Sequence, residues 1–387
     1  MKIVHVLPAL TKGGGERVAV ELANHAAQAG HQVTVIAACP VDSALLRDAL
    51  HHDVRVRYVS DSVDSRVGRY VRVLTWLWRH RLWLADQDIL HCHLTYAVIF
   101  GILVRMWRSV IGAKGPVVVQ TNHSVGAPMS TLRRWILARM AAQCDALALI
   151  AVDEYWRLFA SKHPGIITQV VLNGISNPSY ELVSSAERFA YRQKIGIPDK
   201  CILVVGAVGR LDADRKPWMY LPIFSEIARE FGTGVHFVLA GGGAELDRMR
   251  SLVVEQGLEG QIHFPGQVLE PRLPLAVMNL YISINVGEIT GLAGMEAALS
   301  GLPVLAIQWT SGYRAAPNDW IWSSTDLSEV AKRACKFLRA PTDRQALAER
   351  QKAHVKLHHT TEAMACSYYA LYQAAMVRLQ AKTVGTV

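Results

Sequence analysis

The chain has 387 residues, enough for two domains of ordinary size. Hydrophobic residues make up 51% of the chain and charged residues 19%, which excludes an intrinsically disordered protein. The formal net charge of +9 is uneven: residues 1–178 hold 19 Lys and Arg against 12 Asp and Glu, so this part alone carries +7. The excess of positive charge in the first half predicts an anionic partner there.

The first half of the chain alternates short apolar strands with helices. A helix is expected at residues 16–29, with an apolar face at Val18, Leu22 and Ala26, and Gly30 ends it. Uninterrupted apolar strands separated by helices are typical of a parallel sheet covered on both faces. The strands are expected at Ile3–Leu7, Val33–Ala37, Ile89–His93, Val117–Thr121, Leu147–Val152 and Gln169–Leu172.

The same alternation starts again after residue 200, which predicts a second Rossmann-like domain. Helices are expected at residues 222–231 and 245–256. The segment Asn173–Pro178 and the polar stretch Ser184–Lys194 separate the two halves, so we place the domains at residues 1–178 and 179–363. The strands of the second half are expected at Cys201–Val208, His236–Ala240, Ile262–Phe264, Leu280–Asn285 and Val304–Ile307.

A glycine run, Gly13-Gly14-Gly15, joins the first strand to the first helix. Glycines at such a junction let a ligand approach the backbone at the positive end of a helix. The run is not Gly-x-Gly-x-x-Gly, and the second strand is followed by Ala38-Cys39-Pro40, without the acidic residue that binds a dinucleotide ribose. The pattern therefore does not favour a dehydrogenase.

The most informative stretch is residues 287–305. A strand leads to Glu288, a glycine-rich turn opens a helix that carries Glu296, and Gly301-Leu302-Pro303 ends this helix before another strand. Two carboxylates with seven residues between them, and the free N–H groups of a helix start, suit the hydroxyls and the diphosphate of a sugar nucleotide. In isolation, a helix-capping Glu288 and a solvated Glu296 would be the simpler explanation of the pair.

The glutamate pair and its Gly-x-Pro-Val continuation resemble the retaining nucleotide-sugar glycosyltransferases of family 4. That resemblance implies the GT-B architecture: two Rossmann-like α/β domains facing across a cleft. Its last helix, the amphipathic segment Thr361–Arg378, would cross back onto the N-terminal domain, so residues 364–387 are assigned to this crossover.

Several further loops resemble the family's, in the family's order. Gly209-Arg210-Leu211 with Lys216 six residues after the arginine implies a diphosphate clamp, although Pro217 follows where the family usually has glycine. His123, just after an apolar strand, matches the family's active-site histidine, which would bind the donor sugar and support positive charge near the anomeric carbon. His91 and His93 are weaker candidates for the same site, and a structural role is the ordinary explanation for a single histidine.

The resemblance assigns catalytic roles to Glu288, His123, Arg210 and Lys216. Departures lie beside the glutamates, with Asn285-Val286 where Pro-Ser is usual and Thr290 where an aromatic residue is usual, which leaves the donor sugar open. The residues expected to bind the donor are Gly14, Gly15, Gly209, Gly242, Gln267, Val268, Thr290, Gly291, Leu292 and Glu296.

Two Asp-x-Asp motifs, Asp86-Gln87-Asp88 and Asp212-Ala213-Asp214, match the metal motif of the other large glycosyltransferase fold. Matches this short occur by chance, and neither has that fold's sequence context. We expect neither a catalytic metal nor a cofactor, with the nucleotide sugar as a substrate.

The densest cluster of positive charge, residues 69–83, interleaves arginines with tryptophans. Such a pattern is typical of a membrane interface or a nucleic-acid surface, but no nucleic-acid motif accompanies it, so we expect no nucleic-acid partner. An ordinary helix that packs Val73, Trp76 and Leu77 inward, with solvated arginines, is the alternative. The six scattered cysteines indicate a reducing compartment, and the apolar start reads as a strand and not a signal peptide. We expect a cytoplasmic protein, peripheral on the inner membrane.

Together with the sequence features, the family resemblance implies a retaining, metal-independent hexosyltransferase that uses a UDP- or GDP-sugar and a glycan or lipid-linked acceptor. Its product would belong to a cell-surface polysaccharide, lipopolysaccharide or glycolipid. Two alternatives remain: a nucleotide-sugar epimerase of the same architecture, and a non-catalytic nucleotide-sugar binding protein.

Overall fold

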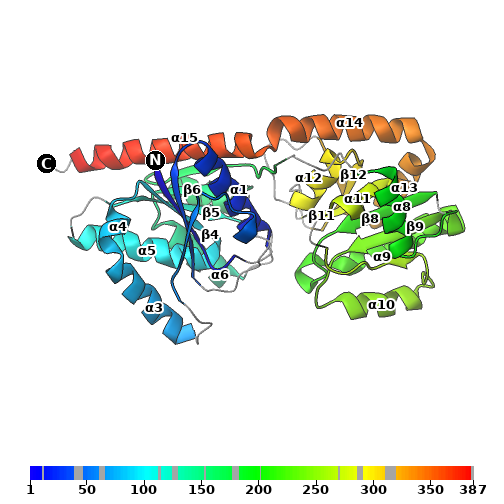
Figure 1. Ribbon diagram of the computed structural model, residues 1–387, viewed down its shortest axis with the longest axis horizontal. Helices are drawn as coiled ribbons and strands as arrows, with labels where there is room; N and C mark the ends of the chain where they lie inside the picture. The colour runs from blue at the N-terminus through cyan, green and yellow to red at the C-terminus, as the bar shows by residue number, and fades with distance from the viewer. Residues whose placement is uncertain are drawn as a thin grey trace. The chain divides into compact units, whose positions relative to one another are not determined.

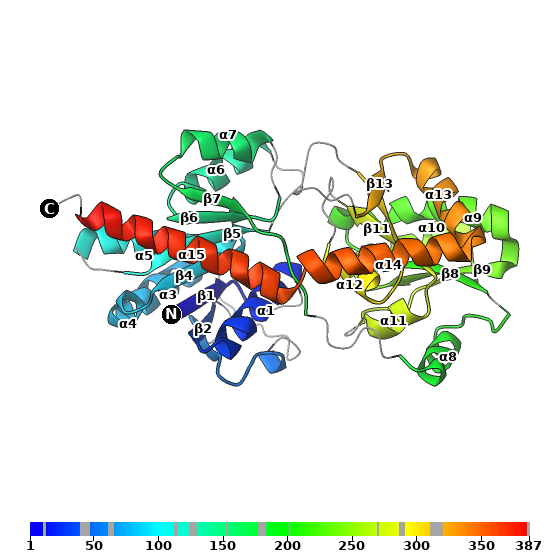
Figure 2. The same ribbon diagram turned by 90° about the horizontal axis from the view of Figure 1, so that it is seen from above.

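The computed structural model describes residues 1–10, 13–38, 47–60, 66–111, 115–123, 130–151, 154–176, 183–200, 202–268, 271–285, 291–309 and 320–384. Their contacts divide the chain into two compact units. Unit 1 comprises residues 1–174 and 361–387, and unit 2 comprises residues 175–360. Figures 1 and 2 show a parallel sheet with helices on both faces in each unit.

Unit 1 has a seven-stranded sheet in the order β3-β2-β1-β4-β5-β6-β7, and every pair of neighbours is parallel. Helices α1 and α15 pack on each other, and α15 also packs on β5, β6 and β7. Helix α5 packs on β1, β4 and β5. The strands are β1 Lys2–Leu7, β2 Gln32–Ala37, β3 Arg55–Tyr58, β4 Ile89–His93, β5 Val117–Asn122, β6 Ala146–Leu149 and β7 Ile167–Val170. The helices are α1 Gly14–Gln28, α3 Arg66–Arg79, α4 Arg81–Ala85, α5 Leu94–Ile111, α6 Thr131–Ala141, α7 Glu154–Lys162 and α15 Thr361–Val384.

Unit 2 has a six-stranded sheet in the order β10-β9-β8-β11-β12-β13, again parallel throughout. Helix α9 packs on α13, and α12 packs on α14. The strands are β8 Leu203–Val208, β9 Val235–Ala240, β10 Ile262–His263, β11 Leu280–Asn285, β12 Val304–Gln308 and β13 Trp322–Ser324. The helices are α8 Ser185–Lys194, α9 Tyr220–Phe231, α10 Leu246–Glu255, α11 Arg272–Ala276, α12 Leu292–Leu299, α13 Leu327–Arg339 and α14 Pro341–His358, with 3₁₀ turns η1 Ala213–Arg215, η2 Pro217–Met219 and η3 Gly232–Gly234.

Both sheets reverse their strand order at one point, between β1 and β4 in unit 1 and between β8 and β11 in unit 2. In open α/β sheets, ligands bind beyond the carboxyl ends of the strands at such a point. The fold thus confirms the prediction of two Rossmann-like parallel-sheet domains, and it directs the search for a site to the loops that follow these four strands.

The predicted strands are present, with bounds that differ by up to three residues. The strands expected at residues 147–152 and 169–172 are β6 and β7, which begin one and two residues earlier. Strands β3 and β13 were not predicted, because β3 alternates arginines with Val56 and Tyr58, and β13 has only three residues. Both are outermost strands, where the sequence need not be continuously apolar.

Candidate functional site

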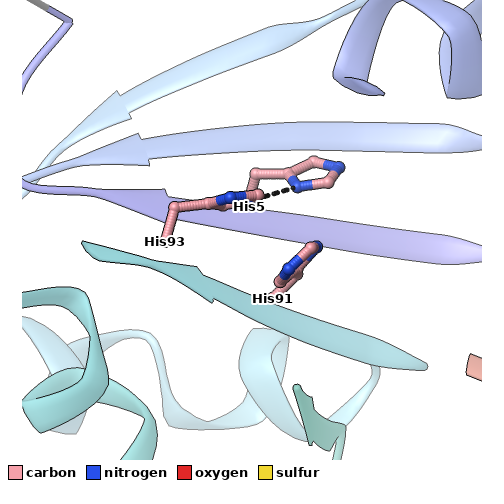
Figure 3. Close-up of side chains that lie close together, drawn as sticks. All are labelled: His5, His91 and His93. Atoms are coloured by element: carbon pink, nitrogen blue, oxygen red, sulfur yellow. Dashed lines mark hydrogen bonds between the residues drawn. The ribbon is translucent and has the colours of Figure 1, made fainter. Parts of the chain in front are cut away.

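Three buried histidines meet at the strand-order reversal of unit 1. His5 lies on β1, and His91 and His93 lie on β4, with His5 and His91 opposite each other in the register. The Nδ1 atom of His5 is 3.0 Å from the Nε2 atom of His93, within hydrogen-bond distance (Figure 3). His91 is bonded separately, to the hydroxyl of Tyr372 at 2.7 Å and to that of Thr121 at 2.6 Å.

His123, which follows β5, joins this cluster from the edge of the sheet. Its Nε2 atom is 3.2 Å from Nδ1 of His93, and the two rings stack with centroids 5.5 Å apart. The glycine loop lies against the same ring: a Cβ atom on Gly15 would be 3.3 Å from Cγ of His123. The structure therefore brings together three of the sequence candidates, Gly15, His93 and His123, while Gly14 is exposed at the first position of α1.

Burial keeps these histidines neutral. It lowers the pKa of His5 to about 3 and that of His123 to about 4. The pKa values of His91 and His93 are also lowered, chiefly by burial and further by the neighbouring rings. At neutral pH the cluster consequently offers hydrogen-bond donors and acceptors without positive charge.

A nitrogen from each of His5, His91 and His93 lies within 4.8 Å of the others, so the set has the composition of a three-histidine metal site. The hydrogen bonds argue against that use. His91 already employs both ring nitrogens, and His5 and His93 are bonded directly to each other. An ion would have to break these bonds inside a cluster that solvent does not reach.

Sequence reasoning did not single out His5. A histidine in the middle of an otherwise apolar strand, beside a second strand that carries His91 and His93, was the available signal. Leu94, directly after His93, has a φ of +65° in the left-handed region. That conformation is unfavourable for a leucine and tends to occur where a site needs a particular backbone course.

In unit 2, glycines let the loops that follow β8 and β9 touch. A Cβ atom on Gly241 would be 1.8 Å from the carbonyl oxygen of Gly209, so only glycine fits at residue 241. On the next residue, Gly242, a Cβ atom would be 3.5 Å from Cβ of Gln267, in the loop after β10. Three of the expected donor-binding residues, Gly209, Gly242 and Gln267, thus line one carboxyl edge, and Val268 follows Gln267 there, half-buried.

Arg210 forms ion pairs with both carboxylates of Asp212-Ala213-Asp214. Its Nη1 atom donates to Asp212, and its Nη2 atom donates to Asp214 at 3.1 Å. Asp212 also accepts a hydrogen bond from the backbone N–H of Ala244 at 3.0 Å, which ties the β8 loop to the β9 loop. Arg210 remains half exposed, with 51% of its side chain accessible, so a bound anion can reach it.

The other Asp-x-Asp motif has a structural role. Asp86 pairs with the Lys2 ammonium at 2.6 Å, and Asp88 accepts from the backbone N–H of Lys2 at 2.7 Å. These contacts join the start of β1 to the start of β4, at the amino edge of the sheet and away from its carboxyl ends.

Lys216 sits between two 3₁₀ turns in the left-handed region, with a φ of 49°. Pro217, the departure from the family pattern, is the first residue of the second turn. The Lys216 ammonium lies 4.1 Å from the centroid of the Trp309 ring, which follows β12. The sequence did not suggest Trp309 as its partner.

The glutamate segment is described in part. Glu288 and Thr290 lie outside the described residues, so their assignments stay predictions. Gly291 is the N-cap of α12, exposed and with no side-chain cap bond, and half-buried Leu292 begins the helix. Glu296, in the second turn, is only 3% exposed. Its charge adds to burial in raising the pKa of Tyr281, whose hydroxyl contacts the backbone of Val208.

The basic, tryptophan-bearing segment forms two helices, α3 and α4, with a break at His80. Val73, Trp76 and Leu77 are buried, as the ordinary-packing alternative predicted. The outer face is nevertheless apolar as well as basic, with Val71, Leu74, Trp78 and Leu82 at 52–79% exposure. Arg81 stacks on Trp78 at 4.5 Å. No helix among the described residues is long and apolar enough to cross a bilayer.

Comparison with known proteins agrees with this architecture. Residues 12–176 match the family model Glycosyltransferase Family 4, and residues 202–352 match Glycosyl transferases group 1. No curated protein sequence matches the chain significantly.

Similar solved structures include Anabaena Alr3699/HepE in complex with UDP and glucose, with 16% identity, a TM-score of 0.74, and coverage of 97% of this chain and 100% of HepE. Sucrose-phosphate synthase from Thermosynechococcus elongatus has 17% identity and a TM-score of 0.72, with coverage of 97% and 100%. WaaG, described as a glycosyltransferase involved in lipopolysaccharide biosynthesis, has 16% identity and a TM-score of 0.65, with coverage of 97% and 98%.

Proposed function

Because the chain belongs to the glycosyltransferases, with a family 4 domain followed by a group 1 domain, we propose that it transfers a hexosyl residue from a nucleotide sugar to a glycan or lipid-linked acceptor. The observation that carries the proposal is the carboxyl edge of the unit 2 sheet. There the glycine backbones after β8 and β9 touch, and Arg210 lies exposed beside them. Bare backbone next to a guanidinium suits a nucleoside diphosphate.

The donor is proposed to be a UDP- or GDP-sugar. HepE, which has a similar fold, binds UDP and glucose, which supports UDP as the first nucleotide to test. The diphosphate would contact Arg210, Lys216 and the N–H groups at the start of α12, beginning at Gly291. Glu288 would contact the sugar and Glu296 the ribose.

The proposed reaction retains the anomeric configuration and uses no metal. The bond between the anomeric carbon and the donor phosphate oxygen breaks, and a bond to the acceptor hydroxyl oxygen forms on the same face. The departing phosphate oxygen takes the acceptor proton, so no side chain is needed as a general base. Arg210 and Lys216 would stabilise the negative charge that develops on the diphosphate.

Arg210 would exchange ion-pair partners during this reaction. Its pairs with Asp212 and Asp214 are exposed, so each contributes little stability, about 0–1 kcal/mol. A bound diphosphate presents several charged oxygens to the guanidinium and can displace such exposed contacts. Asp212 would keep its bond to Ala244 and hold the loop in place.

A panel of UDP- and GDP-sugars tests the donor. The matching donor should raise the melting temperature of the purified protein, since a ligand that binds only the folded state stabilises it. Transfer to acceptor should then be assayed with that donor. Conversion of the donor without acceptor would favour the epimerase, and binding without any turnover would favour the binding protein.

We further propose that the protein attaches to the cytoplasmic face of the inner membrane and uses a lipid-linked acceptor of the polyprenyl-diphosphate or lipopolysaccharide type. The outer face of α3 and α4 supports this, because exposed Leu74, Trp78 and Leu82 accompany exposed Arg72 and Arg79. The similarity to WaaG is consistent with this class of acceptor. Residues 105–108 are expected from the sequence to belong to the same surface, and there Arg105 donates to the carbonyl oxygen of Cys144 and pairs with Asp145.

Vesicle sedimentation tests the attachment. Replacing Arg69, Arg72, Arg79 and Arg81 with Gln should release the protein from anionic vesicles, because each basic residue near such a surface contributes about 1 kcal/mol. A matched control replaces four cations of unit 2, Arg250, Lys332, Lys336 and Arg350, and should sediment like the wild type. A wild-type protein that stays in solution with these vesicles at low salt would remove the support for both attachment and lipid acceptor.

A further inference from the structure

His5, His93 and His123 form a continuous hydrogen-bonded line from the interior of unit 1 to its carboxyl edge. The Nδ1 atom of His5 meets Nε2 of His93 at 3.0 Å, and Nδ1 of His93 meets Nε2 of His123 at 3.2 Å. Figure 3 shows the inner bond, between strands β1 and β4. Among the described residues, Nδ1 of His123 has no hydrogen-bond partner, so it is the nitrogen left for a ligand.

The number of protons along this line restricts its arrangement. A neutral imidazole carries one N–H and one lone pair, and burial keeps these rings neutral. Two arrangements satisfy both hydrogen bonds. In the first, each ring is protonated on Nδ1 and donates outward, from His5 to His93 to His123. In the second, each ring is protonated on Nε2 and donates inward.

The inner end of the line distinguishes the two arrangements. Nε2 of His5 is buried and has no hydrogen-bond partner among the described residues. The inward arrangement would place a proton there, as a buried N–H without an acceptor. The outward arrangement would leave only a lone pair unsatisfied. Buried N–H groups without partners are the rarer of the two in proteins, so the outward arrangement is favoured.

We propose that His5 and His93 are positioning residues that hold His123 in the Nδ1–H form, so that it presents a hydrogen-bond donor to an oxygen of the bound sugar. The inference rests on the proposed function for the identity of the ligand, a hydroxyl-bearing sugar, but not for the proton arrangement. It also separates the two roles that the family resemblance implies for His123. In the Nδ1–H form, His123 can donate a hydrogen bond to the sugar. It then has no Nδ1 lone pair with which to support positive charge near the anomeric carbon.

His91 does not take part in the line, although its ring centroid is only 3.9 Å from that of His93. Its two nitrogens are bonded to Tyr372 and Thr121, and Thr121 is bonded in turn to the hydroxyl of Tyr368 at 3.0 Å. These bonds join β4 and β5 to α15. His91 therefore packs beside His93 and links the sheet to α15, without taking part in the line.

Two replacements of His93 separate its two hydrogen bonds. The Asn amide nitrogen can take the place of Nδ1, so His93→Asn retains a donor toward His123. The Gln amide nitrogen can take the place of Nε2, so His93→Gln retains a partner for His5 and loses the donor toward His123. Both are polar and uncharged, and each serves as the control for the other.

The proton arrangement is read by ¹⁵N NMR of histidine-labelled protein, with the His123 signal identified by its loss in His123→Gln. The wild type should show His123 protonated on Nδ1. His93→Asn should keep this form, and His93→Gln should shift His123 toward the Nε2–H form. A wild-type His123 protonated on Nε2 would overturn the proposal even if neither variant folds, and so would equal tautomer populations in the two variants.

Sugar transfer is the second readout. His93→Gln should lower kcat/KM at least about tenfold, since a misplaced histidine proton is costly wherever the ring must donate. His93→Asn should lower it less than about threefold. A changed tautomer with unchanged transfer would overturn the role in transfer. A wild type that transfers no sugar would count against the proposed function, while the NMR result would still decide the proton arrangement.

Discussion

The two carboxyl edges of this protein have the same topology and opposite chemistry. In unit 1, the strand-order reversal between β1 and β4 is filled by neutral, buried histidines. In unit 2, the reversal between β8 and β11 is bordered by glycine backbone and by the exposed charges of Arg210 and its two aspartates. The parallel sheet decides where a ligand can bind, and the side chains after the strands decide which chemical groups each edge can bind.

The two edges therefore suit different chemical groups. A diphosphate needs positive charge and free N–H groups, which unit 2 supplies. A sugar needs hydrogen bonds without strong charge, and the histidine line of unit 1 supplies a donor. Each of the following predictions would break or sharpen the comparison.

The largest effect is expected from Glu288. Replacing Glu288 with Ala should abolish transfer and leave nucleotide affinity largely intact, because the carboxylate is assigned to the sugar. Replacing Glu296 with Ala should weaken donor binding instead, as measured by titration calorimetry. Near-normal turnover in Glu288→Ala would remove the catalytic assignment.

The contact between the β8 and β9 loops gives the next effect. Gly241→Ala should destabilise unit 2 by about 1–3 kcal/mol, because the new methyl group would overlap the Gly209 carbonyl oxygen and force the backbone apart. Gly209→Ala is the matched control, since no atom lies within 4 Å of the Cβ it would add. Urea unfolding measures both. Equal stabilities would show that the loops do not need this close approach.

A smaller loss is expected from the cations of unit 2. Arg210→Ala and Lys216→Ala should each slow transfer at least about tenfold, the scale of losing one charge that stabilises the departing diphosphate. Activity should survive EDTA. Strict dependence on added Mn²⁺ or Mg²⁺ would contradict the metal-independent mechanism and would favour Asp212 and Asp214 as metal ligands.

The smallest effect at neutral pH concerns His5, whose contribution appears only in acid. Its pKa is about 3 in the folded chain and near 6.5 when unfolded, so between these values the unfolded state binds more protons. Stability therefore falls as the pH drops below 6.5, by up to about 1.4 kcal/mol per pH unit for one histidine. His5→Asn should show a shallower decline between pH 6.5 and 4.5 in thermal unfolding. His52→Asn, at an exposed position, should follow the wild type, and identical slopes in all three proteins would contradict the assignment.

Much of the fold could be read from the sequence because a parallel sheet buries both faces of its inner strands. Ile89–His93 and Leu280–Asn285 were predicted with their observed bounds, since each is a short, mainly apolar run that directly follows a polar residue. The outermost strands β3 and β13 were missed because an outermost strand need not be continuously apolar. The break at His80 between α3 and α4 was also missed, because no proline or glycine marks it.

Site residues could be predicted only where a short motif also indicates a position in the fold, such as the end of a strand. The glycine loops and Arg210 lie at strand ends, as their positions after apolar runs indicated. Pairing across the sheet was not predictable. His5 is 88 residues from its partner His93, and Trp309 is far from Lys216 in sequence, so local pattern does not report either contact.

The sequence by itself determined the two Rossmann-like domains and the glycosyltransferase family, because strand and helix periodicity and short glycine, arginine and glutamate motifs are local properties. Only the tertiary structure decided what the polar residues do. It assigned one Asp-x-Asp motif to Lys2 and the other to Arg210, and it joined three histidines from three strand segments into one line. Hydrogen bonds and ion pairs act over a few ångströms in space, and the order of strands in the sheet sets which residues come that close.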